Sequence, residues 1–505
     1  MKTLLMHRDH NFDWQRELPP TAENLIQDLG LAVLFKTMCG NDEFLMQVAQ
    51  RAVLWSLTDP DEIVYRQQAL NDCIEHPEVV RAMYDLTVET VVERRKIWGW
   101  FGEMPELNLR YAIQVMELLI RMLKRLRHVA LESGTGFKSP AFKRFFAMLL
   151  DELDDEYFAT VNEHLRRLQF RRGVRISAGL GKGNSAVDIV LRPPLTERRG
   201  LSELIFGPRE GGLWFDVHPR DEAGGQALSE LQARGINLVA NTLTQATEHV
   251  LGFLNQLRAE LAFYIDCLNL RAALHERGVE TSFPRPKPAA EPELSARGLY
   301  DAALALVAGH GVVANDVAAV GRGLVVITGA NQGGKSTFLR SLGIAQLLMQ
   351  AGMFVAALDF SANVATGIFT HFKREEDPTM TRGKLDEELS RMSRIVDEVR
   401  PGGLLLCNES FASTNEREGS EIGKQVIGAI NAAGVKVLLV THLFDLTQRF
   451  RRDAPDGMLF LRAERLSDGT RTFKIREGEP LSTSHGKDLY DEIFHDGASA
   501  NSAND

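Results

Sequence analysis

The sequence lacks the long apolar runs from which membrane-spanning helices are made. Such a helix needs about 18 or more consecutive apolar residues, and no run of that length occurs among the 505 residues. The apolar stretch at the amino terminus is also too short for the core of a secretory signal peptide. We therefore expect a protein that has no membrane partner.

Cysteine is scarce, and the four cysteines are scattered without any CxxC spacing: Cys39, Cys73, Cys267 and Cys407. This pattern indicates neither a disulfide framework nor a zinc site, and it is typical of the reducing cytoplasm. No internal repeat of 20–50 residues occurs, which excludes solenoids and propellers. The net charge of −10 argues against wrapping nucleic acid with the whole surface, although local basic clusters remain.

A length of 505 residues predicts two to four domains, and the apolar share of 44% is ordinary for a globular chain. Four prolines and mixed charges between residues 282 and 293 predict a stiff linker and the main domain boundary. The small, polar tail is expected to be disordered. The predicted parts are a helical domain with a small β insertion at about 172–218, a linker, an α/β domain and a tail, over residues 1–283, 284–293, 294–496 and 497–505.

The first part reads mainly as helices. Asp59 followed by Pro60 is a strong helix-start signal, because it places a capping side chain before proline at the first helical position. Apolar spacing predicts long helices over residues 107–132 and 243–277, and the second is long enough to act as a lever. Between them, three short β-type runs predict the insertion, at residues 174–178, 186–191 and 213–217.

From about residue 294 strands and helices alternate, which predicts a mostly parallel sheet covered by helices. The strands are expected at residues 324–328, 367–372, 404–409 and 435–441. Two shorter runs, 458–461 and 472–475, predict a hairpin at the edge of the sheet.

A glycine loop follows the first of these strands. Gly329, Gly334, Lys335 and Ser336 fit the pattern G-x-x-x-x-G-K-[ST] between a predicted strand and a predicted helix. Glycines allow main-chain N–H groups to turn inward around phosphate oxygens, and the start of the helix adds positive potential. Lys335 is expected to reach the β- and γ-phosphates, and Ser336 to ligate Mg²⁺. The pattern predicts a nucleotide-binding site. The alternative is a chance match, which is less frequent when a predicted strand precedes the pattern and a predicted helix follows it.

Two further strands end in polar residues, at the edge where open α/β sheets bind ligands. Asn408 stands where a P-loop enzyme usually has an aspartate that holds a Mg²⁺-bound water; an amide accepts a hydrogen bond but brings no charge. Glu409 is then the candidate base for the attacking water, and His442 the candidate γ-phosphate sensor. The alternatives are a surface glutamate at a strand end and a structural histidine.

The carboxyl-terminal half resembles the ATPase domain of the MutS mismatch-repair family, a branch of the ABC-type ATPases. Five blocks carry the resemblance in order: VAND (313–316), TGANQGGKST (328–337), FVAA with IFT (354–357 and 368–370), NESFASTNEREG (408–419) and THLFDLT (441–447). The resemblance implies ATP with Mg²⁺ and adds Asn331, Gly333 and Thr337 to the nucleotide-binding set. The helices around 59–70 and 243–286 resemble, more weakly, the core and returning lever of that family.

The sequence departs from the family pattern in three places. The mismatch-reading module with its Phe-x-Glu wedge, the connector, and a nuclease-like domain are all expected to be absent. Asn408 replaces the acidic residue of the family. The signature segment, which in the family reaches the nucleotide of the partner subunit, begins with Gly383 and Lys384 instead of Ser-Thr-Phe. Gly383 can still present an N–H at a helix start, and Lys384 can supply charge.

One P-loop per chain implies a homodimer, because in ABC-type ATPases each nucleotide lies between two such domains. DNA is the second expected partner. The candidate phosphate contacts lie in basic clusters, which could equally be solvated helix faces paired with acids. The candidates are Arg121, Lys124, Arg125, Arg171 and Arg172, and the clusters also contain Arg127, Arg175 and the residues at 94–96, 166–167 and 198–199. Trp98 and Trp100 are candidates for base stacking, with core packing the more frequent role of such residues.

Three hypotheses follow from the sequence. The first is a cytoplasmic MutS-like ATPase, a dimeric clamp that binds mismatched or branched DNA in repair or recombination. The second is a nucleotide-gated dimerisation switch for a protein partner, with little hydrolysis. The third, the motor subunit of a membrane transporter, is the weakest, since no LSGGQ-type signature occurs.

Overall fold

The structure is a computed structural model that describes residues 1–97, 105–170, 174–182, 186–192, 218, 220–309, 311–374, 383–453, 457–466 and 469–481. The chain packs as two compact units. The helical unit comprises Met1–Thr3, Glu78–Phe137 and Phe142–Arg258, and the α/β unit comprises Leu4–Pro77, Lys138–Ala141 and Ala259–Asp505. In the described part of the chain, no helix combines the length and the apolar character that crossing a bilayer requires.

Apolar residues at helical spacing account for the helical unit. The predicted helix at 107–132 is confirmed as α6, with buried residues such as Leu109, Leu119 and Leu123 along one side. The other elements of this unit are α5 (Pro77–Lys96), α6 (Pro105–Ser133), the 3-10 turn η1 (Gly134–Gly136), most of α7 (Pro140–Glu152), α8 (Asp155–Leu168) and the first part of α10 (Glu222–Glu276).

The predicted β insertion is confirmed in part. Strands β1 (Arg175–Leu180) and β2 (Ala186–Arg192) form an antiparallel pair. The third expected strand, at 213–217, lies outside the described residues.

Helix α10 begins at Glu222, 21 residues before the predicted start at 243. The sequence hides this extension because it contains glycines, each of which costs a helix about 1 kcal/mol relative to alanine. Gly235 has a packing role that sequence cannot show. A Cβ there would lie 2.9 Å from Cδ1 of Ile176, so glycine lets β1 pack closely on α10.

The α/β unit begins with short helices: α1 (Ala22–Asp28), α2 (Leu31–Cys39), α3 (Glu43–Leu54) and α4 (Pro60–Glu75). The Asp59 carboxylate accepts a hydrogen bond from the amide of Asp61, so the predicted start of α4 is confirmed. The remaining elements are β3 (Arg285–Lys287), β4 (Leu294–Leu299), α11 (Ala302–Ala308), β5 (Asn315–Ala318), β6 (Leu324–Thr328), α12 (Lys335–Gln350), β7 (Asp359–Asn363), β8 (Ile368–Phe372), α13 (Lys384–Glu398), β9 (Leu404–Asn408), α14 (Glu416–Ala432), β10 (Lys436–Val440), α15 (Phe444–Asp453), β11 (Met458–Arg465) and β12 (Arg471–Glu477).

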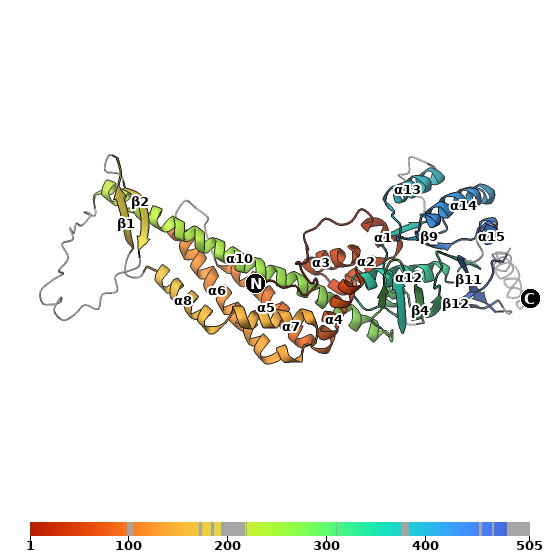
Figure 1. Cartoon of the computed structure of the whole chain (residues 1–505), viewed down its shortest axis with the longest axis horizontal. Helices are drawn as coiled ribbons and strands as arrows, with labels where there is room; N and C mark the ends of the chain where they lie inside the picture. Colours follow the sequence, from red (N-terminus) through yellow and green to blue (C-terminus); the bar gives the residue numbers. More distant parts are fainter. Residues whose placement is uncertain are drawn as a thin grey trace, which may run out of the picture. The chain divides into compact units, whose positions relative to one another are not determined.

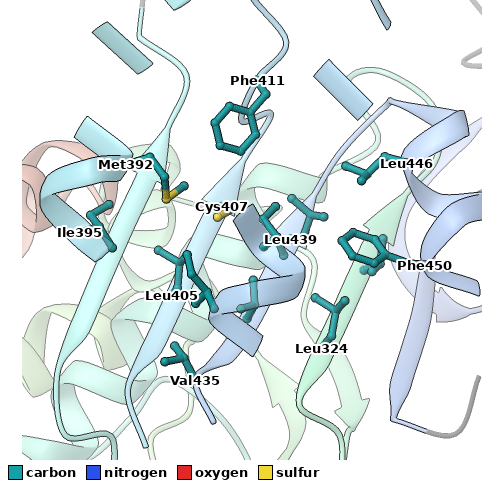
Figure 2. Packing of buried hydrophobic residues seen from close by; sticks show 14 of the residues in the cluster. Leu324, Met392, Ile395, Leu405, Cys407, Phe411, Val435, Leu439, Leu446 and Phe450 are labelled. Carbon is teal, nitrogen blue, oxygen red and sulfur yellow. The ribbon is translucent and has the colours of Figure 1, made fainter. Parts of the chain in front are cut away.

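A six-stranded sheet of order β12-β11-β6-β10-β9-β8 forms the centre of this unit (Figure 1). The four predicted parallel strands are confirmed as β6, β8, β9 and β10. One face of the sheet packs on α13, α14 and α15, through an apolar cluster that includes Leu405, Leu439 and Phe450 (Figure 2). Helix α12 lies on the other face, where a Cβ at Gly343 would come within 3.1 Å of Leu406.

The predicted hairpin of β11 and β12 is confirmed, but only β12 lies at the edge of the sheet. Strand β11 pairs in parallel with β6, so the hairpin lies beside the strand that leads into the glycine loop.

The proline-rich segment at 284–293 differs from the predicted linker. Arg285–Lys287 forms strand β3, which pairs with β7 in a second sheet of order β3-β7-β4-β5. Proline suits this position because β3 is an edge strand, where a missing N–H leaves no ladder bond unmade. The division between the two compact units falls after Arg258, within α10.

Candidate functional site

The loop between β6 and α12 has the backbone that the glycine pattern predicts. Gly329 and Gly334 have φ values of 113° and 87°, in the region that favours glycine. A Cβ at Gly329 would lie 2.9 Å from the main-chain nitrogen of Ala463, and one at Gly333 would lie 2.8 Å from Cβ of Ala463. These glycines therefore let the loop pass close to Ala463 of β11.

Lys335 is the first residue of α12, and its side chain turns back over the loop. Its ammonium donates hydrogen bonds to the carbonyl oxygens of Gly329 and Ala330, both at 2.9 Å. Burial lowers the pKa of Lys335, an effect that the negative charge of Glu409 opposes. The ammonium thus lies at the mouth of the loop, bound to neutral groups, where the charge remains available to an anionic ligand.

Ser336 and Asn408 meet as the sequence predicts. The hydroxyl of Ser336 donates a hydrogen bond of 2.9 Å to Oδ1 of Asn408, which ends β9. Both contribute neutral oxygen donors, the hard ligand type that Mg²⁺ prefers. Because the amide has no charge, this pair is expected to hold the cation less strongly than a serine and a carboxylate.

Glu409 and His442 lie side by side at the carboxyl ends of β9 and β10. Nδ1 of His442 is 3.9 Å from Oε1 of Glu409. The imidazole of His442 lowers the pKa of Glu409, outweighing the opposite effect of burial, with smaller contributions from Lys335 and Lys373. Glu409 is therefore ionised at neutral pH. The structure brings together the two residues predicted to act in hydrolysis.

A cavity of about 610 Å³ opens beside these groups. Its walls include Asn331, Gly333, Gly334, Lys335, Ser336, Thr337 and Glu409, all predicted from the sequence. Gly329, Asn408 and His442 do not line it, but each contacts a residue that does.

The far wall of the cavity contains residues that sequence analysis missed. Phe473 is about half exposed there, and Asn315 holds its strand by donating a 3.2 Å hydrogen bond to its carbonyl oxygen. Arg471 donates to the side chain of Gln332, at 2.7 Å, and so ties β12 to the loop. The VAND block contains Asn315. No sequence pattern, however, indicates that Arg471 and Phe473, about 140 positions after the glycine loop, lie next to that loop.

The predicted signature residues lie apart from this cavity. Gly383 is the N-cap of α13, with φ −66° and ψ 152°, and Lys384 is the first residue of that helix. Neither residue lines the cavity. This placement agrees with a segment that serves a second copy of the chain, which stays a prediction.

The candidate DNA contacts give a mixed result. Arg125 binds both carboxylate oxygens of Glu89 at 2.7 Å, and Lys124 lies over the ring of Phe158. Arg121 is exposed on α6. Arg171, Arg172, Trp98 and Trp100, together with the 198–199 pair, lie outside the described residues.

Other basic residues of these clusters also have acidic partners: Arg94 with Glu248, Lys96 with Glu93, Arg127 with Asp155 and Arg167 with Glu163. The interpretation as helix faces paired with acids therefore holds for Arg94, Lys96, Arg125, Arg127 and Arg167.

The fold and the loop define the class of this unit: a P-loop domain of the α/β type, with an acidic residue and a histidine at the strand ends. Comparison with known families adds the particular assignment. The profile of the MutS2 N-terminal domain matches residues 58–277, and that of MutS domain V matches residues 325–486. The chain belongs to the MutS family.

Individual relatives match parts of the chain. Endonuclease MutS2 of Geobacillus thermodenitrificans is 25% identical over 324 residues, which cover 58% of this chain and 40% of that protein. Endonuclease MutS2 of Lacticaseibacillus casei is 26% identical over 226 residues, 43% of this chain and 28% of the relative. DNA mismatch repair protein MutS of Thermus aquaticus is 33% identical over 124 residues, which cover 25% of this chain and 15% of that protein. The match thus spans less than half of each of these relatives.

Proposed function

We propose that the chain binds and hydrolyses ATP and couples this to DNA, as a MutS-type ATPase. The observation that best supports the proposal is the convergence of Lys335, Ser336 and Glu409 on one cavity beside a glycine loop. Two of the matched relatives are named as an endonuclease and a DNA mismatch repair protein, which supports DNA as the partner.

In this proposal the loop amides and Lys335 hold the β- and γ-phosphates. Ser336 and Asn408 would hold Mg²⁺, which neutralises charge on the phosphates when it is bound. The carboxylate of Glu409, whose pKa the neighbouring His442 lowers, accepts a hydrogen bond from the attacking water and takes its proton. His442 keeps Glu409 oriented and lies where a γ-phosphate contact is expected.

A homodimer follows from the same reasoning. One chain supplies one P-loop, and Gly383 with Lys384 starts a helix away from that cavity. A second copy would bring these residues to the nucleotide, so that ATP joins the two chains and hydrolysis releases them. The four cysteines are buried and free, which agrees with a cytoplasmic location.

The test is the rate of ATP hydrolysis by the purified chain alone and with plain duplex, mismatched duplex or a four-way junction, at moderate salt. We expect hydrolysis, and a change in its rate with at least one DNA. If no DNA alters the rate or binds below micromolar concentrations, the DNA part of the proposal is wrong.

A second candidate function is a nucleotide-gated dimerisation switch with little turnover, acting on a protein partner. Asn408 favours it, because an amide hydrogen-bonded to Ser336 replaces the usual carboxylate. Asn408→Asp separates the two functions. If the amide limits hydrolysis, the variant turns over ATP much faster than the wild type, whereas a brisk wild-type rate argues against the switch.

A further inference from the structure

A buried histidine lies behind the proposed catalytic carboxylate. His371 is on β8 and pairs with Cys407 of the parallel strand β9. Glu409 follows Cys407 by two residues, so His371 lies beside the segment that carries Glu409. The exposed fraction of His371 is 0%. A buried polar group without partners is costly, so the partners of both ring nitrogens matter.

Each nitrogen of His371 contacts a different element of the site. Nδ1 lies 2.7 Å from the hydroxyl of Ser410, which directly follows Glu409. Nε2 lies 3.0 Å from the main-chain oxygen of Glu388, on helix α13. The ring therefore joins the helix that begins with Gly383 and Lys384 to the segment that carries Glu409.

The chemistry of the partners assigns the hydrogens. A carbonyl oxygen only accepts, so Nε2 donates to Glu388. Burial, and next to it the charge of Arg391, lowers the pKa of His371 to about 4, so the ring is neutral at pH 7. Nδ1 therefore accepts from the Ser410 hydroxyl. The main-chain oxygen of His371, 2.9 Å away, is a second acceptor for the same hydrogen, so both alternatives fix Ser410 to β8.

The segment that His371 holds is a strained one. Glu409 and Phe411 have φ values of 54° and 62°, a region that L-residues other than glycine occupy rarely and at a cost in free energy. Such a conformation persists where the surroundings enforce it. His371 contacts Ser410 between them, and its ring stacks on that of Phe411 with centroids 5.7 Å apart. Figure 2 shows Phe411 at one end of the core cluster.

We propose that His371 is a positioning residue, through which the orientation of Glu409 depends on the position of helix α13. This inference rests on the proposed function, because it takes Glu409 as the base. A shift of α13, such as engagement of its first residues by a second chain, then changes the rate of hydrolysis rather than the affinity for nucleotide. The link runs from Glu388 through His371 to Ser410.

The experiment uses the full chain and three variants that cut the link at different points. His371→Gln keeps a donor that reaches Glu388 but removes the ring acceptor of the Ser410 hydroxyl, so that only the main-chain oxygen of residue 371 remains. His371→Asn keeps an acceptor near Ser410 but cannot reach Glu388. Ser410→Ala removes the hydroxyl. Phe369→Leu is the matched control, because Phe369 is buried on the same strand but belongs to the apolar cluster.

Each variant is measured for kcat, for the dissociation constant of a fluorescent ATP analogue and for thermal stability. We expect Ser410→Ala and His371→Gln to lower kcat about tenfold with affinity within twofold of the wild type. Their double variant should be no worse than either alone, and His371→Asn should retain more activity than His371→Gln. Phe369→Leu should lower stability and leave kcat unchanged. Equal loss of kcat in Phe369→Leu, or a parallel loss of affinity, would overturn the proposal.

Hydrogen exchange without nucleotide separates this inference from the proposed function. Peptides across residues 404–412 should exchange faster in Ser410→Ala and His371→Gln than in the wild type or the control. If the wild type does not hydrolyse ATP but exchange changes as expected, the proposed function fails and the link between α13 and this segment stands. If exchange in the variants matches the control, the link itself is wrong.

Discussion

The cations at the P-loop and those on the helical unit have different partners. Lys335 donates to two main-chain oxygens of its own loop, beside a cavity. Arg125 and Arg127 of α6 instead bind the carboxylates of Glu89 and Asp155, each at 2.7 Å. A cation bound to neutral carbonyls keeps its charge for an incoming anion, whereas a carboxylate cancels most of the field of its partner.

The difference shows which basic residues have a charge that is available to bind an anionic ligand. A sequence count of lysines and arginines treats both kinds alike, but the structure separates the lysine of the glycine loop from helix-face cations such as Arg125 and Arg127, which are paired with acids. The proposed function of the α/β unit therefore rests on few residues at one edge of a sheet. Any contact between the helical unit and nucleic acid has to come from residues such as Arg121, or displace existing pairs.

Glu409→Gln should have the largest effect, because it removes the proposed base. We expect turnover to fall by about 10²–10⁴-fold with nucleotide binding retained, measured by phosphate release and by titration with a fluorescent ATP analogue. Glu89→Gln is the control from the helical unit, since it changes a carboxylate that pairs with Arg125. Normal hydrolysis by Glu409→Gln would refute the catalytic assignment.

Acid should weaken the α/β unit through a second buried histidine. Nε2 of His7 lies 3.1 Å from Arg66, which can only donate, so this nitrogen must be unprotonated. Burial, and then the charge of Arg66, lowers the pKa of His7 to about 3. Between pH 6.5 and 3 the unfolded chain binds a proton that the folded chain does not, so stability falls as pH falls.

The expected loss is up to a few kcal/mol, read from urea unfolding at several pH values. His7→Gln should flatten the dependence of stability on pH over this range. A variant with the same slope as the wild type would show that His7 is not responsible.

The glycines of the two units should respond oppositely to alanine. Gly329→Ala forces a side chain into φ 113° and 2.9 Å from a main-chain nitrogen, so we expect a loss of about 1–3 kcal/mol and weaker nucleotide binding. Gly225→Ala, in α10, meets no atom within 4 Å and should stabilise by up to about 1 kcal/mol. Denaturant midpoints measure both, and equal changes would contradict the account of the loop.

The basic residues of α6 should give the smallest effects. If the helical unit binds DNA, Arg121→Ala should weaken binding more than Arg125→Ala, because Arg125 must first leave Glu89. We expect less than about 1 kcal/mol for either, measured by fluorescence anisotropy at fixed salt. A larger loss for Arg125→Ala would show that its pair with Glu89 does not persist on DNA.

Much of the α/β unit could be predicted because its signals are local. The run from Leu324 to Ser336 encodes strand, loop and helix within thirteen consecutive residues, and the structure has each in place. Glu409 and His442 were predictable because polar residues at the ends of parallel strands meet at one edge.

What sequence missed depends on contacts between distant residues. Phe473 reaches the cavity because β11 pairs with β6, a choice that no local pattern records. His371 gave no signal, because its roles depend on Ser410 and Glu388 in the folded chain. The prediction of a linker at 284–293 differs from the structure because a proline-rich composition also fits an edge strand such as β3.

The most direct test of the account is an equilibrium titration of the chain with a fluorescent ATP analogue and Mg²⁺, displaced by ATP. We predict one site per chain, which Lys335→Ala abolishes. Lys436→Ala should leave it intact. Lys436 is a partly buried lysine at the first residue of β10, far along the strand from His442, and it bonds to the main chain of Glu293. Absence of saturable binding by the wild type, or equal binding by Lys335→Ala, would contradict the claim that this cavity is a nucleotide site.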